Sequence, residues 1–144
     1  MKNLLLSLLL AAAPALAQQP VLRTVELGAG MHLIRAELAD SDATRSLGLM
    51  QRTSLAPNGG MLFLFGAPGR YCMWMKNTLL PLSVAFIDET GAIVNIEDMR
   101  PRTEESHCAE RAVPYALEMR QGWFRERGIR AGFRLRGLDK LPPR

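Results

Sequence analysis

Residues 73–88 read MWMKNTLLPLSVAFID and place a polar tripeptide, Lys76-Asn77-Thr78, between two apolar stretches. The stretch LSVAFID, at 82–88, is apolar on both of its faces and is therefore predicted to be a central strand. The segment YCMWM, at 71–75, predicts another strand on the other side of the tripeptide. The tripeptide is either the polar turn between two core strands or a site that those strands hold in place.

The rest of the chain carries similar short strand signals separated by turns. Residues 21–39 alternate loosely around a Gly-Ala-Gly turn and predict a hairpin, with His32, Ile34 and Ala36 on one face. Further strands are predicted at 61–65, 92–99, 115–122 and 131–138, and short helices within 40–52 and 123–130. About seven or eight short strands with two short helices indicate a mainly β fold, a small antiparallel barrel or sandwich.

The N-terminal sequence MKNLLLSLLLAAAPALAQQ begins with a positive charge at Lys2, continues with an apolar run and reaches Ala15-Leu16-Ala17. This arrangement is typical of a secretory signal peptide at residues 1–17. The alternatives are an uncleaved anchor or a buried helix, but the run of about ten apolar residues is too short to span a bilayer unaided. We expect one β-rich domain, residues 18–144, that is exported to the periplasm or the medium, lacks a transmembrane span and is monomeric.

The net charge of the full chain is +4, and arginine is concentrated in the last third of the sequence. The arginines of that region are Arg120, Arg125, Arg127, Arg130, Arg134, Arg136 and Arg144. A basic face of this kind can bind nucleic acid or anionic lipid. Because these arginines are spread out and an exported domain rarely meets nucleic acid, we expect a solvated face and no nucleic-acid partner.

Two cysteines, Cys72 and Cys108, lie in the predicted mature chain. In an oxidising compartment such a pair indicates a disulfide, whereas inside an apolar strand Cys72 would also pack well as a free thiol. The sequence supports these alternatives equally. The cysteines and histidines lack the spacing of a zinc site, and we expect no metal and no cofactor. Copper handling through Met73, Met75 and the two cysteines is a weaker alternative.

The tripeptide offers the groups that a polar ligand needs, because Lys76 brings a cation, Asn77 an amide and Thr78 a hydroxyl. Two further cations, Arg45 and Arg52, flank the first predicted short helix and its Leu49-Met50 end. If both came near Lys76, three cations would line one pocket and would suit a carboxylate or phosphate group. The alternative is a surface turn in which the lysine forms a structural salt bridge.

Five segments taken together resemble a known family. They are RSLGLMQR (45–52), GMLFLF (60–65), MWMKNTLLPLSVAFID (73–88), GAIVNIEDMRP (91–101) and VPYALEMRQGWFRERGIRAGFRL (113–135). Their order and spacing are similar to those of a bacterial and archaeal family, domain of unknown function 192, over residues 24–136. The resemblance implies a small, mainly β, often exported domain, and it brings no established activity. The polar motif residues that it indicates are Arg45, Arg52, Lys76, Asn77, Thr78, Asp88 and Glu118.

These seven residues are our predicted ligand site, and the leading hypothesis is that they bind a small anionic molecule or a component of the cell envelope. The alternative from another class is an enzyme acting on envelope material. In that case Lys76 would serve as a base, with Asp88 or Glu118 as its partner.

Overall fold

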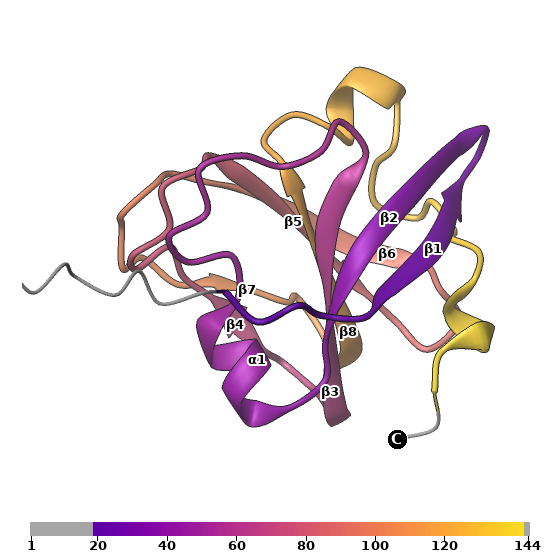
Figure 1. Cartoon of the computed structure of the whole chain (residues 1–144). Coiled ribbons are helices and arrows are strands. Elements are labelled where there is room, and N and C mark those ends of the chain that lie inside the picture. Colours follow the sequence, from indigo (N-terminus) through magenta and orange to yellow (C-terminus); the bar gives the residue numbers. More distant parts are fainter. Residues whose placement is uncertain (1–18, 143–144) are drawn as a thin grey trace, which may run out of the picture.

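The computed structural model describes residues 19–142, so the predicted signal peptide at 1–17 lies outside the described residues. Six strands form one sheet in the order β1-β2-β3-β8-β5-β6, and β4 and β7 form a second, two-stranded sheet (Figure 1). The elements are β1 (Thr24–Ala29), β2 (His32–Ala39), α1 (Asp42–Leu47), β3 (Gly59–Gly69), β4 (Cys72–Met73), β5 (Leu82–Ile87), β6 (Ile93–Met99), β7 (His107–Cys108), β8 (Val113–Arg120), η1 (Arg125–Arg127) and η2 (Leu138–Lys140). The mainly β prediction is confirmed.

The large sheet carries an apolar cluster on each of its faces. Strand β3 shows the alternation, because Leu62 and Leu64 belong to one cluster whereas Met61 and Phe63 belong to the other. The first cluster draws buried residues from all six strands of the sheet, which therefore curls around it. The second cluster lies on the outer face and is covered by loop residues such as Met75.

Strand β5 is an inner strand of the sheet, as the apolar stretch at 82–88 predicts. It pairs antiparallel with β6 on one side and with β8 on the other, and all six of its residues are buried. The alternation predicted for the first hairpin is also confirmed, since Ile34 and Ala36 of β2 are fully buried while Leu33 and Arg35 are exposed.

The sheet is not wholly antiparallel, which corrects one part of the prediction. Strands β2 and β3 run parallel, with Leu38 opposite Leu62. A parallel pair needs a long crossover connection rather than a tight turn. Residues 40–58, which include α1, provide that crossover. The helix begins at a Ser41 N-cap whose side chain accepts a hydrogen bond from the Thr44 amide.

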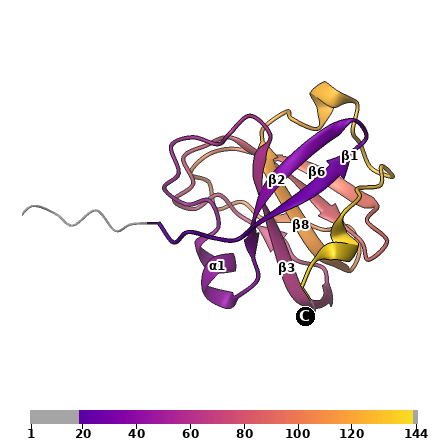
Figure 2. The ribbon, with the colours of Figure 1, turned by 45° about the vertical axis from the view of Figure 1, so that its right-hand side comes forward.

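The strand predicted at 131–138 is wrong, because these residues form only isolated bridges. Gly28 of β1 bridges Arg136, and Ala92, next to β6, bridges Arg134. The C-terminal segment thus hydrogen-bonds to both edges of the large sheet, as its position beside the β1–β2 hairpin in Figure 2 illustrates. The two edge strands do not pair with each other, so the sheet is not closed into a barrel.

Two other predicted elements are shorter in the structure. The helix expected within 123–130 is the 3-10 turn η1, which ends at Gly128 in the left-handed conformation. The strand expected at 71–75 is only β4, Cys72–Met73, and it pairs with β7 of the long polar loop rather than with the main sheet. A disulfide joins Cys72 to Cys108 across that pair, with their Cα atoms 3.9 Å apart.

Gly60 allows β3 and β8 to approach each other closely, and this contact can be tested. A Cβ atom at Gly60 would clash with the Glu118 carbonyl oxygen and with the sulfur of Met119. We expect Gly60→Ala to lower the free energy of unfolding by about 1–3 kcal/mol, because packed backbone cannot yield to an added atom. Urea denaturation of the variant measures the effect.

The matched control is Gly66→Ala, at a position of the same strand where an added Cβ meets no atom within 4 Å. This variant should retain wild-type stability. Equal stability of both variants would refute the close approach of β3 and β8.

Candidate functional site

A cavity of about 360 Å³ lies over the outer face of the large sheet. Three parts of the chain surround it: the end of α1 with the turn after it, the second half of β3, and the segment containing β4. Its lining residues are Arg45, Ser46, Leu47, Gly48, Leu49, Met50, Phe63, Phe65, Tyr71, Cys72, Met73, Trp74, Thr78 and Glu118. We call it the Glu118 cavity, after the residue of the central strand β8 that lines it.

Glu118 is held on the sheet by its neighbours in the two flanking strands. It lies opposite Met61 of β3 and opposite Val84 of β5. The residue is 3% exposed, and burial raises the pKa of its carboxyl group to about 8. Within residues 19–142 no side chain or backbone group forms a hydrogen bond or an ion pair with this carboxyl. With a pKa of about 8, this carboxyl is mostly protonated at neutral pH and keeps hydrogen-bonding capacity at the cavity.

The walls of the cavity are mainly apolar and aromatic. Phe63 and Phe65 point from β3 toward the second apolar cluster, and Tyr71 packs against that cluster. The rings of Phe65 and Tyr71 are stacked, with centroids 3.8 Å apart, and the Tyr71 hydroxyl donates to the Ala67 carbonyl at 2.6 Å. This stack fixes the aromatic wall on β3. Trp74 is 47% exposed and continues the lining toward solvent.

Among the residues that the structure describes, Arg45 is the one cationic residue in the lining of the Glu118 cavity, and it also lines a neighbouring concavity with Arg23 and Asp40. One of its nitrogens donates to the Leu64 carbonyl at 2.6 Å, and another pairs with Asp42 at 2.7 Å. Its side chain is 23% exposed, whereas Asp42 is fully exposed. A guanidinium group has five N–H donors, so these two contacts position Arg45 and leave donors for a ligand.

The tripeptide Lys76-Asn77-Thr78 forms a turn. The Thr78 amide donates to the Met75 carbonyl at 3.1 Å, and Asn77 adopts the left-handed conformation with a φ of 54°. The Asn77 carbonyl in turn accepts from the Gln51 amide, which ties this turn to the one that follows α1. Of the three residues, Thr78 alone is buried and lines the Glu118 cavity.

Lys76 and Asn77 face a separate concavity of about 370 Å³ on the other side of this turn. Gln51, Leu79, Arg102 and Glu104 complete its lining. The Lys76 side chain is 49% exposed, lies 3.8 Å from a Glu104 oxygen and sits over the ring of Trp74. The turn therefore separates the predicted site into a buried part, with Thr78, and an exposed part, with Lys76.

Two of the predicted residues have structural partners and do not line the Glu118 cavity. Arg52 pairs with Glu37 of β2 at 2.9 Å and so anchors the turn after α1 to the sheet. Asp88 accepts hydrogen bonds from Thr90 and from the Ala92 amide, and these contacts lower the pKa of its carboxyl against the cost of burial. It organises the β5–β6 turn.

The structure thus brings together Arg45, Thr78 and Glu118, and separates them from the remaining predicted residues. The arrangement required by the enzyme hypothesis is absent from residues 19–142, because Lys76 pairs with Glu104 rather than with Asp88 or Glu118. The aromatic lining, Phe63, Phe65 and Tyr71, was not identified from sequence. Its only signal was the apolar alternation, which is equally typical of an ordinary core.

Of the methionines within residues 19–142, Met31 is exposed and the others lie in the core or at the cavity. Met61, Met75, Met99 and Met119 are fully buried, whereas Met50 and Met73 line the Glu118 cavity. Cys72 and Cys108 are joined in a disulfide, so neither offers a thiolate for copper. In the described part of the chain no three His, Cys, Asp or Glu side chains gather in an arrangement that could hold a metal ion.

The model of a family described as an uncharacterized ACR, domain of unknown function 192, matches residues 23–137. The chain belongs to this family. The resemblance predicted from the five sequence segments is thereby confirmed. No curated protein matches the chain. Within residues 19–142, no helix has both the length and the apolar character needed to cross a membrane.

Two solved structures are similar to this family member. A proposed transcription regulator from Sinorhizobium meliloti 1021 is 39% identical, with a TM-score of 0.74, and the match covers 79% of this chain and 92% of that one. A protein of unknown function from Novosphingobium aromaticivorans DSM 12444 is 33% identical, with a TM-score of 0.77, and the match covers 87% of this chain and 93% of that one.

The buried carboxyl predicts a particular dependence of stability on pH. The pKa of Glu118 is about 8 in the folded protein and 4.5 in an exposed chain, so the folded state binds the proton more tightly. Its stabilising contribution is full below pH 4.5 and is lost as the pH rises to about 8. Over this range we expect the free energy of unfolding to fall by up to about 1.4 kcal/mol per pH unit.

Urea denaturation between pH 5 and pH 8 tests this expectation with Glu118→Gln, which cannot ionise. The difference in stability between wild type and Glu118→Gln should change steadily with pH. The control Glu89→Gln alters an exposed carboxyl and should follow the wild-type curve. Parallel curves for Glu118→Gln and wild type would show that Glu118 titrates as an ordinary exposed carboxyl.

Proposed function

We propose that this domain binds a small ligand with an apolar body and an anionic group, and that the ligand occupies the Glu118 cavity. The observation that carries the proposal is a buried, unpaired carboxyl that shares an apolar cavity with an arginine. The Glu118 carboxyl lines the open cavity, where a solvent molecule or a ligand can hydrogen-bond to it, and it differs in this from the fully buried unpaired atoms of residues 19–142, which are His107 Nε2 and Arg127 Nε. A ligand that hydrogen-bonds to Glu118 would supply the partner.

The walls of the cavity suit the apolar body of such a ligand. Phe63, Phe65 and Met73 offer hydrophobic surface, and small-molecule sites typically combine such walls with a few convergent polar groups. The volume of about 360 Å³ lies at the small end of such sites, so the ligand is metabolite-sized. Each 100 Å² of apolar surface removed from water would contribute about 2.5 kcal/mol to binding before entropic costs.

The polar groups suit an anion. Arg45 lies at the same cavity and presents planar donors that match a carboxylate or phosphate. Glu118 does not repel such a group while it is protonated, and its hydroxyl can donate a hydrogen bond to the ligand. The buried Thr78 hydroxyl donates its one proton to the Lys76 carbonyl at 3.2 Å, so it offers no donor to the anion.

The exposed half of the predicted site enters the proposal only as a neighbouring surface. Lys76 and Arg102 would raise the local concentration of anions near the cavity rather than contact a ligand inside it. We keep the periplasm or the medium as the proposed location, because the N-terminal sequence has the pattern of a signal peptide and the disulfide suits an oxidising compartment.

The description of the Sinorhizobium protein as a transcription regulator raises nucleic-acid binding as a rival function. The arginine contacts of this chain argue against it. Arg120 pairs with Glu126 at 2.6 Å, and Arg125 pairs with Asp98 at 3.0 Å. Arg136 donates to the Gly30 carbonyl at 2.7 Å. Cations that are neutralised or held by the protein contribute less to phosphate binding than free ones, so we do not propose this function.

Paired arginine variants test the proposal. Octanoate provides an apolar chain with a carboxylate, and octanol is its uncharged counterpart. We expect calorimetry to show octanoate binding that Arg45→Ala weakens about tenfold or more, because a charge-assisted hydrogen bond is lost. Octanol affinity should change little in the same variant.

The control is Arg52→Ala, which removes a cation at the other end of the same segment but outside the cavity. It should lose some stability and keep wild-type affinity for octanoate. If wild-type protein binds octanoate no better than octanol, or if Arg52→Ala weakens octanoate binding as much as Arg45→Ala, the proposed site is wrong.

The protonation of Glu118 should also appear in binding. Octanoate is fully ionised above pH 6, so a fall in its affinity above about pH 8 would report ionisation of Glu118 in the cavity. In Glu118→Gln the affinity should stay constant up to pH 9, because no charge develops. Calorimetric titrations at four pH values measure this, and identical pH profiles for the two proteins would exclude contact between Glu118 and the ligand.

A further inference from the structure

One wall of the Glu118 cavity is the segment of residues 71–74, which contains β4. Strands β4 and β7 have two residues each and form a sheet of their own, separate from the six-stranded one. An isolated two-stranded ribbon is marginally stable at best, even with longer strands. The position of this wall therefore depends on contacts other than the strand pairing.

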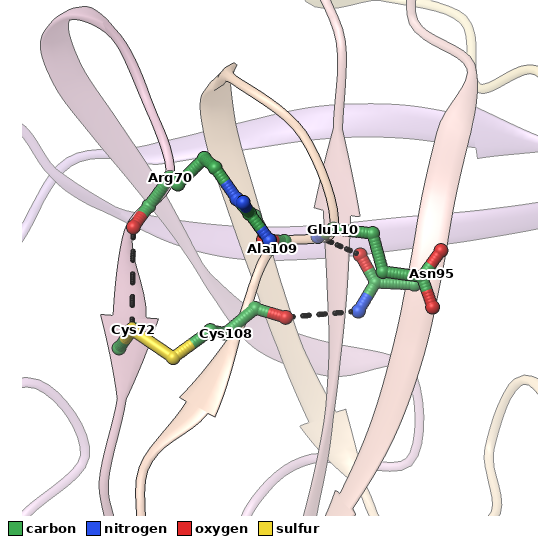
Figure 3. Close-up of a disulfide and its surroundings, with 6 residues drawn as sticks. All are labelled: Arg70, Cys72, Asn95, Cys108, Ala109 and Glu110. Atoms are coloured by element: carbon green, nitrogen blue, oxygen red, sulfur yellow. Dashed lines mark hydrogen bonds between the residues drawn. A yellow bond between two sulfur atoms is a disulfide. The ribbon is translucent and has the colours of Figure 1, made fainter.

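Strand β7 is firmly attached to the main sheet through Asn95 of β6, as Figure 3 shows. The Asn95 side chain donates to the Cys108 carbonyl at 3.1 Å and accepts from the Glu110 amide at 3.1 Å. Asn95 is 5% exposed, and both His107 and Ala109 are buried. The β7 side of the ribbon is thus a fixed support.

The β4 side is held to that support by few contacts. The Ala109 amide donates to the Tyr71 carbonyl at 2.9 Å, and the Arg70 side chain donates to the Ala109 carbonyl at 3.3 Å. The ladder pairs of Cys72 with Cys108 and of Met73 with His107, and the disulfide between Cys72 and Cys108, complete these contacts (Figure 3). Cys72 is exposed to solvent and also lines the cavity, so a reductant can reach the bond that holds the wall.

We infer that the Cys72–Cys108 disulfide is a redox-controlled latch on the wall of the Glu118 cavity, and that its reduction lowers the affinity of the cavity for ligand. This inference rests on the proposed function. Reduction would free residues 70–74 from their covalent support, while the six-stranded sheet that carries Glu118 contains no disulfide. The part of the wall formed by Cys72, Met73 and Trp74 would become mobile, while Tyr71 stays stacked on Phe65 and the remaining lining keeps its place.

The chemistry requires a dithiol reductant. One thiolate of the dithiol attacks a sulfur of the disulfide and displaces the other cysteine as a thiolate, which takes up a proton. The second thiol of the reductant then attacks the mixed disulfide and releases the remaining cysteine. Two electrons and two protons pass to Cys72 and Cys108, and the reductant leaves as its own disulfide.

Hydrogen exchange tests the latch without any ligand. Amide exchange of the folded protein is compared by mass spectrometry with and without dithiothreitol. We expect amides in residues 70–74 and the Ala109 amide to exchange at least tenfold faster after reduction. Residues 113–120 of β8 serve as the internal control and should exchange at the same rate in both states. Unchanged exchange at 70–74 would refute the latch, and faster exchange throughout β8 would show general unfolding instead.

Octanoate affinity then tests the regulation. We expect reduction to weaken octanoate binding about tenfold and reoxidation to restore it. The double variant Cys72→Ser/Cys108→Ser should bind like the reduced protein, and the reduced wild type serves in its place if the variant does not fold. Equal affinity of the oxidised and reduced proteins would overturn the regulation. If the oxidised protein does not bind octanoate at all, the proposed function fails, and the exchange experiment alone still decides whether the disulfide holds the wall.

Discussion

Strand β8 is the element on which the rest of the structure depends, because it pairs along its length with both β3 and β5. These two pairings join the N-terminal half of the sheet to the β5–β6 hairpin. They also oblige alternate residues of β8 to face opposite clusters, so Leu117 enters the inner cluster and Glu118 the outer face. Strand register thus places the carboxyl in the buried outer face beside the cavity, and this burial raises its pKa.

The strands that could be predicted from the sequence are those whose apolar or alternating residue pattern reflects burial in the main sheet. Strand β5, which is buried at every position and apolar except at Ser83, was located as a central strand, and the alternation of β2 was located on the right faces. The errors concern segments whose structure depends on distant partners. The parallel alignment of β2 with β3 and the edge contacts of residues 131–138 leave no periodic signal of their own, because register across a crossover is decided by packing.

For the site, the residue types indicated which side chains could bind a ligand, but the sequence did not show which of them lie close together. Arg45, Thr78 and Glu118 were named from sequence and line one cavity. Lys76 and Asn77 are neighbours of Thr78 in the chain, but the left-handed turn at Asn77 places them on its other side. A single residue in the left-handed conformation redirects the side chains on either side of it, and the spacing of hydrophobic residues in the sequence carries no signal for such a residue. The pairing of Cys72 with Cys108 was undecidable from sequence because β4 looked like part of a longer apolar strand.

The contacts of the C-terminal segment have a consequence for how the fold is completed. Gly28 and Arg136 exchange backbone hydrogen bonds, and the same segment bonds to Gly91 and Ile93 beside the opposite edge of the sheet. Contacts between residues so far apart in the chain are costly to close and form late. Until they form, both edges present unpaired backbone groups, which is the condition under which sheets join edge to edge. Residues 132–136 therefore protect both edges of the sheet, and we expect a truncation that removes them to make the protein more prone to aggregation even if every strand of the sheet remains.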